Sequence, residues 1–106
     1  MSAEQFEYEI YVPLSDNQGN RFPTEVLAAF KQEIIEKFAG LSDLKYKSEG
    51  VWKLHGVEYH DEIVLWRVYG GASPSEEKFL QDLKQRMLRE FRQKDLLLVK
   101  RRVEFI

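Results

Sequence analysis

The sequence predicts one α+β domain over residues 1–106: a ferredoxin-like βαββαβ two-layer sandwich, with an antiparallel four-stranded sheet and two helices on one face. Two observations carry this prediction. The first is the order of the patterned segments, which alternates strand, amphipathic helix, strand hairpin, amphipathic helix and strand with short connections. The second is size, because 106 residues with 43% hydrophobic side chains suit a single core and leave no room for a second domain.

The first strand is expected from Phe6 to Leu14, where apolar and other residues alternate with the period of two that is typical of a sheet with one buried face. Its even-numbered side is expected to face the core. The first helix is expected over Thr24 to Phe38, because apolar residues recur there every three or four positions. Gly40 follows the last turn and is the expected left-handed residue at the helix end.

The central hairpin is predicted from Leu44 to Tyr69, with the reversal at His55-Gly56, where glycine permits a tight turn. From Ile63 to Val68 apolar side chains fall on both parities of the strand. This pattern indicates a central strand that is covered on both faces. A partner over the open face of the sheet is therefore expected.

The second helix is predicted to start at Ser73-Pro74-Ser75-Glu76, a capping box with proline at the first helical position. Its buried stripe extends to Phe91. The last strand is expected from Leu96 to Ile106. It should lie beside the first strand, as the ferredoxin-like strand order 4-1-3-2 requires.

Basic residues in the last strand raise the question of nucleic-acid binding. With that strand beside the first, we expect Lys100 and Arg102 to lie across from Glu7 and Glu9 on the open face. Opposite charges placed in this way stabilise a sheet by about 0.2 to 1 kcal/mol per pair. We prefer this structural interpretation because the formal net charge is −2 and gives no positive field to attract phosphates.

Composition excludes several classes of function. The chain has no cysteine, so it cannot form disulfides, thiolate nucleophiles or cysteine-bound metal centres. The segment Met1 to Gln5 has no apolar core of a secretory signal, and no apolar stretch approaches the length of a membrane span. We expect a soluble cytoplasmic protein with no membrane partner.

RNA-recognition modules share this topology and need a separate test. Their third strand carries a Lys/Arg-Gly-aromatic-Gly/Ala-Phe-Val-x-aromatic signature. The segment from His60 to Arg67 lacks the glycine pair and contains acids, so no nucleic-acid partner is expected. Gly70-Gly71 lacks the spacing and lysine of a phosphate-binding loop, and nothing in the chain indicates a cofactor.

The two histidines, His55 and His60, are the other candidates for chemistry. His60 and Glu62 share one face of a strand, but two ligands do not make a selective site, so no metal is expected. As catalytic candidates, His60 or Glu62 could transfer protons near a group of aromatic residues. That group is Trp52, Tyr59 and Trp66. Packing is the favoured interpretation of these aromatic side chains.

Three short motifs follow one another along the chain: Phe38-Ala39-Gly40-Leu41, Gly50-Val51-Trp52 before the Gly56 hairpin, and Phe91-Arg92-Gln93 leading into Leu97-Leu98-Val99. In this order they resemble a bacterial family of small proteins known only as a domain of unknown function. The chain departs from the family pattern at Ala39, where proline is usual, and at Val51, where glutamine is usual. The resemblance implies a fold without an assigned activity, so no catalytic residue is carried over.

Two hypotheses for function follow. The first is a non-enzymatic module that forms a homodimer, or binds a partner or ligand, through the open sheet face. The residues expected on this face are Tyr11, Ile63, Leu65 and Arg67. The alternative is a small enzyme of the dimeric α/β-barrel kind, in which His60 or Glu62 transfers a proton inside an apolar pocket.

Overall fold

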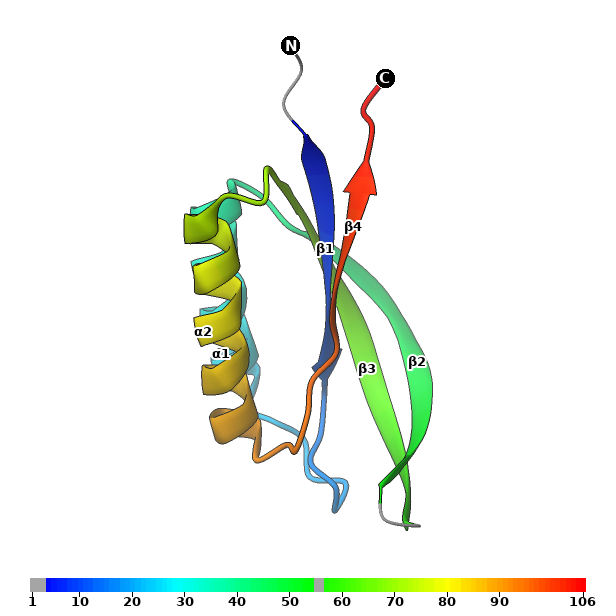
Figure 1. Ribbon diagram of the computed structural model, residues 1–106. Helices are drawn as coiled ribbons and strands as arrows, with labels where there is room; N and C mark the ends of the chain where they lie inside the picture. The colour runs from blue at the N-terminus through cyan, green and yellow to red at the C-terminus, as the bar shows by residue number, and fades with distance from the viewer. Residues whose placement is uncertain (1–3, 55–56) are drawn as a thin grey trace.

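The computed structural model describes the backbone of residues 4–54 and 57–106 and the side chains of residues 4–44 and 62–106. Its elements are β1 (Gln5–Pro13), α1 (Thr24–Phe38), β2 (Ser42–Leu54), β3 (Val57–Gly70), α2 (Pro74–Phe91) and β4 (Leu98–Val103). Both helices lie on one face of the sheet, and the opposite face carries no helix (Figure 1). The predicted ferredoxin-like βαββαβ arrangement is confirmed.

The sheet has four strands in the order β2-β3-β1-β4, with every neighbouring pair antiparallel. This is the predicted strand order. Tyr8 pairs with Val68 and Ile10 pairs with Trp66 across β1 and β3. The pairing of β2 with β3 shifts register between Leu44 and Ser48. The β2–β3 hairpin projects beyond the helical layer in Figure 1.

The core lies between the helices and the even-numbered side of β1, as predicted. Tyr8, Ile10 and Val12 are fully buried there. The side chains that pack against them are Phe30, Ile34, Trp66, Val68, Leu80, Leu83, Met87, Phe91 and Leu96. Each such apolar side chain contributes about 1.5 to 3 kcal/mol when it leaves water, so this layer is the main source of stability.

The predicted capping box begins α2. Ser73 Oγ accepts a hydrogen bond from the Glu76 amide at 3.2 Å, and Pro74 is the first helical residue. The Glu76 carboxylate accepts bonds from the amides of Gly71 and Ala72 at 3.0 and 3.1 Å, in place of the Ser73 amide that a capping box usually binds. A Cβ at Gly70 would overlap this carboxylate, so a larger residue there would require the Glu76 side chain to move away from the two amides.

The end of α1 differs from the prediction. The left-handed residue is Ala39, with φ of 60°, and not Gly40. The helix ends at Phe38, so the next residue, Ala39, takes the left-handed conformation. Gly40 would take it only if the helix were one residue longer. An alanine in this conformation costs about 1 to 2 kcal/mol, because its Cβ approaches the following carbonyl oxygen.

The predicted phase of the last strand is wrong. The register places Arg101 opposite Glu7 and Val99 opposite Glu9, so Lys100 and Arg102 do not face these acids. The two basic side chains instead point toward the helix side, and Lys100 Nζ lies 4.5 Å from the centre of the Phe6 ring. Long cationic side chains can cover apolar surface with their methylene groups, which allows Lys100 to lie at the margin of the core beside Phe6.

Candidate functional site

The candidate site is the open face of the sheet, opposite the helices. The register pairs Tyr11 with Leu65, Pro13 with Ile63, and Glu9 with Arg67. All of these are odd-numbered positions, and their even-numbered neighbours are in the core, so period-two alternation places them on the open face. The structure therefore brings the four expected residues, Tyr11, Ile63, Leu65 and Arg67, onto one surface. Their role in binding remains a prediction.

An ion network crosses the middle of this face. Arg67 Nη2 lies 3.1 Å from Glu9 Oε2, and Arg67 Nε lies 3.3 Å from Glu7 Oε1. Arg101 Nη1 lies 3.0 Å from Glu7 Oε1 and also contacts the carboxylate of Glu9. Two acids and two guanidinium groups therefore neutralise one another.

Burial makes this network unusual for a sheet face without a helix. Glu9 is only 4% exposed, because Arg67 and Arg101 cover its carboxylate. A carboxylate removed from water needs such charged partners. Arg67 and Arg101 keep part of their surface in solvent.

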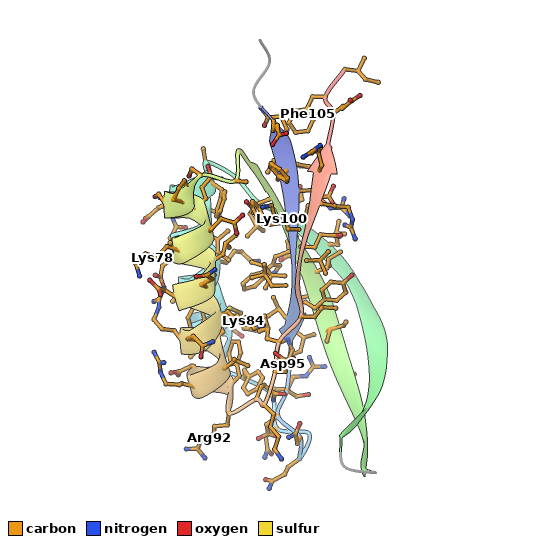
Figure 2. All side chains as sticks on the ribbon, in the orientation of Figure 1. Lys78, Lys84, Arg92, Asp95, Lys100 and Phe105 are labelled. Atoms are coloured by element: carbon orange, nitrogen blue, oxygen red, sulfur yellow. The ribbon has the colours of Figure 1, made fainter. Side chains whose placement is uncertain are left out.

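Apolar side chains surround the network. Within the part of the chain that the structure describes, the exposed large hydrophobic residues are Tyr69, Leu97, Phe105 and Ile106. Tyr69 and Phe105 form an edge-to-face pair with ring centres 5.2 Å apart, and Phe105 lies beyond the end of β4 in Figure 2. Leu97 accepts a hydrogen bond through its carbonyl from the amide of Tyr11, which places it beside Tyr11. Its neighbour Leu96 is buried in the core whereas Leu97 is exposed, so alternation puts the Leu97 side chain on the open face.

A recess lies on the other side of the sheet, between α1 and strands β2 and β3. It has a volume of about 360 Å³, and its apolar walls are Leu14, Leu27, Ile35, Val64 and Trp66. Lys31 Nζ and Asp43 Oδ2 form an ion pair at 2.5 Å at this recess. The Lys31 ammonium also lies 5.4 Å from the centre of the Trp66 ring. The recess thus combines an aromatic floor with one positive and one negative group.

A second polar cluster joins α2 to β1 and β4. The Tyr8 hydroxyl donates to Glu77 Oε1 at 3.2 Å, and Lys100 Nζ donates to the same oxygen at 2.7 Å. Burial raises the pKa of Tyr8 to about 12, and the charge and hydrogen bond of Glu77 act in the same direction. The phenol therefore stays protonated at neutral pH.

The predicted proton-transfer group falls partly within the described residues. Glu62 is an exposed residue of β3, and its Oε2 pairs with Arg21 Nη2 at 2.9 Å. Trp66 is in the core, with its indole Nε1 buried and without a hydrogen-bond partner among the described residues. The structure does not bring Glu62 into the recess with Trp66. Its catalytic role stays a prediction.

The remaining residues of that hypothesis are outside the described part. They are the side chains of Trp52, Tyr59 and His60, together with the whole of His55 and Gly56. Among the described residues, no group of three or more histidine or acidic side chains is placed to hold a metal ion. No described helix has the length and apolar character that crossing a membrane requires.

Sequence reasoning missed the recess and the cluster of Tyr8, Glu77 and Lys100. Lys31 lies in α1 and Asp43 lies in β2. The side-chain periods of a helix and a strand differ, so no local sequence pattern relates the two residues. Tyr8 and Glu77 are 69 positions apart. One signal was present for the open face, namely the apolar residues on both parities of β3.

The fold and the two-layer arrangement define a ferredoxin-like α+β protein. No protein-family model matches the chain, and no curated protein matches it. Among solved structures it is similar to a phage SAM lyase in complex with S-methyl-5′-thioadenosine, with a TM-score of 0.69 and 16% identity over 95% of this chain and 83% of that one. It is similar to CutA1 from Oryza sativa, with a TM-score of 0.62 and 13% identity over 98% and 84% of the two chains.

A third similar structure is the GlnK–ATP complex of B. subtilis, with a TM-score of 0.58 and 17% identity over 97% of this chain and 84% of that one. CutA1 and GlnK have the same ferredoxin-like arrangement. At these identities the likeness establishes a shared fold.

Proposed function

We propose that the protein is a non-enzymatic module that associates with a second copy of itself through the open sheet face. The observation that carries this proposal is the position of the exposed large hydrophobic side chains. Among the described residues, Tyr69 and Leu97 lie on this face, and Phe105 packs against Tyr69. Exposed apolar surface gathered on one face is typical of an interaction site.

The charges of the face favour a second copy over a charged partner. Glu7 and Glu9 are neutralised by Arg67 and Arg101, so within the described part of the face these four side chains contribute no net charge that would attract an acidic or basic surface. Paired guanidinium and carboxylate groups can exchange hydrogen bonds with the same groups of a copy related by a two-fold axis. The exposed side chains of Tyr69, Leu97 and Phe105 would supply the apolar part of such a self-complementary contact.

Sedimentation velocity at several protein concentrations tests the proposal. We expect a concentration-dependent dimer that the substitution Leu97→Asp shifts toward monomer, because a charge in an apolar contact must lose its water. Gln81→Asp, on the exposed side of α2, adds the same charge and is the matched control. A strict monomer at high concentration, or equal effects of both substitutions, overturns the proposal.

The alternative function is a small enzyme of the dimeric α/β-barrel kind that uses His60 or Glu62 for proton transfer. The observation that bears on it is the recess between α1 and the sheet, where Trp66 forms part of the wall, but the exposed Glu62 does not line this recess. Incubation with S-adenosylmethionine, followed by detection of S-methyl-5′-thioadenosine, tests the chemistry suggested by one similar structure. Product formation that Glu62→Gln or His60→Ala abolishes would support the enzyme and displace the first proposal.

Two further expectations belong to this proposal. One is membership of the bacterial family known as a domain of unknown function, which rests on the motifs around Ala39, Trp52 and Arg92. The other is a cytoplasmic location, which fits the absence of cysteine from the chain. Fractionation of cells that express the full chain checks the location.

A further inference from the structure

We propose that the recess between α1 and strands β2 and β3 binds a free α-amino acid with an apolar side chain. The recess lies on the helix side of the sheet, away from the open face. Binding there does not depend on self-association. The proposal rests on the charge pair of the recess, on its apolar walls and on the way the two adjoin.

The charge pair selects a ligand that carries both signs. Lys31 and Asp43 are in contact, with side chains 29% and 17% exposed. A ligand with only a carboxylate would place it beside Asp43, and a ligand with only an amine would place it beside Lys31. Both would bring like charges together in a partly desolvated site. A zwitterion offers each group an opposite charge.

The hydrogen-bonding capacity of the pair allows this addition. The Lys31 ammonium has three donors, of which one is directed to Asp43, so further donors can reach a ligand carboxylate. A carboxylate has about four lone-pair sites, so Asp43 can accept from a ligand ammonium in addition to its present partners. The Lys31–Asp43 pair can therefore hold the α-carboxylate and the α-amino group together.

The apolar walls accommodate the side chain of the ligand. Leu27, Ile35, Val64 and Trp66 line the recess, whose volume of about 360 Å³ is at the lower end of the range for small-molecule sites. The Lys31 ammonium lies over the Trp66 ring, so the charged and apolar parts of the recess adjoin. An amino acid with a leucine, methionine or phenylalanine side chain has its charges and its apolar group in the same relation.

Isothermal titration calorimetry of the full chain with L-phenylalanine tests the proposal. Its single-charge analogues, 3-phenylpropionate and phenethylamine, show how much the affinity depends on a ligand that carries both charges. Each lacks one charged hydrogen-bonding group, so we expect both to bind about tenfold more weakly or worse. Equal affinity of the three compounds, or no heat of binding at millimolar concentration, overturns the proposal.

Substitutions on α1 locate the site. Ala28 and Ala29 are both exposed, but only Ala28 lines the recess, while Ala29 lines a separate groove toward α2. We expect Ala28→Phe to abolish binding by filling the recess and Ala29→Phe to leave it unchanged. Binding that survives Ala28→Phe places the ligand elsewhere and overturns the proposal.

Removal of each charge completes the test. Lys31→Met and Asp43→Asn should each weaken L-phenylalanine binding about tenfold or more, whereas Lys78→Met, which breaks an exposed ion pair with Asp82, should have no effect. Circular dichroism shows whether each variant is folded. If a charge variant does not fold, the Ala28→Phe and Ala29→Phe variants still give an independent result. Sedimentation of the same samples distinguishes failure here from failure of the proposed dimer.

Discussion

Arg67 donates a hydrogen bond to Glu9 at 3.1 Å on the sheet face that neither helix covers. The acid is almost completely buried, and its carboxylate contacts the side chains of Arg67 and Arg101. The pair ties β3 to β1, because Glu9 and Arg67 are opposite one another in the register. It therefore holds the centre of the candidate site in a fixed arrangement.

The substitution Arg67→Met should destabilise the protein by about 2 to 3 kcal/mol, because it leaves part of the Glu9 carboxylate buried without its charged donor. Urea unfolding measures the change. Lys78→Met removes an exposed pair and should change the free energy of unfolding by less than about 0.5 kcal/mol. Similar losses in the two variants would contradict the importance of burial at Glu9.

The substitution Ala39→Gly should stabilise the protein by about 0.5 to 1 kcal/mol, because glycine adopts the left-handed conformation at the end of α1 without steric cost. Thermal and urea unfolding both measure this gain. Ala29→Gly, in the interior of the same helix, should instead destabilise by about 1 kcal/mol. A loss of stability in Ala39→Gly would show that the left-handed conformation is not the one in solution.

The substitution Gly70→Ala should cost about 1 to 3 kcal/mol, because the added methyl group overlaps the Glu76 carboxylate and crowds the Phe38 ring. Gly71→Ala is the neighbouring control, since a Cβ there meets only ordinary van der Waals contact. The comparison uses the midpoint of urea unfolding. Equal effects at both positions would argue against the position of Glu76 in the loop.

The raised pKa of Tyr8 predicts a loss of stability at alkaline pH. The folded state holds the phenolic proton more tightly than the unfolded state, so this stabilisation is present below pH 10 and is lost as the pH rises from 10 toward about 12. Tyr8→Phe should show a smaller loss over this window than the natural chain. Tyr69→Phe, which alters an exposed ring, should follow the natural chain and serves as the control.

Local patterns predicted most of the fold. The alternation in β1 gave the buried side of Tyr8, Ile10 and Val12, and the capping box gave the start of α2. These features depend on residues a few positions apart, so the sequence carries them directly.

The phase of β4 could not be predicted in the same way. Lys100, Arg101 and Arg102 are consecutive, so charge does not distinguish the two faces of the strand. Lys100 faces the helix side because its long side chain lies over Phe6 and its ammonium reaches Glu77. Such contacts depend on where α2 lies against the sheet, and a single strand does not encode this position.

The candidate sites depend on the same kind of information. Tyr11 and Leu65 were expected together because strand pairing follows from the fold. The recess at Lys31 and Asp43 depends on the distance between α1 and strands β2 and β3, which side-chain volumes across the whole core determine.

The brevity of β4 has a consequence for how copies of this chain can meet. It forms one border of the sheet, only six residues long, and carries three consecutive cationic side chains. An incoming strand from another molecule would find few free backbone groups and would be repelled if it carried the same cations. Growth of a continuous intermolecular sheet from this border, which is the first step toward fibrils, is therefore disfavoured.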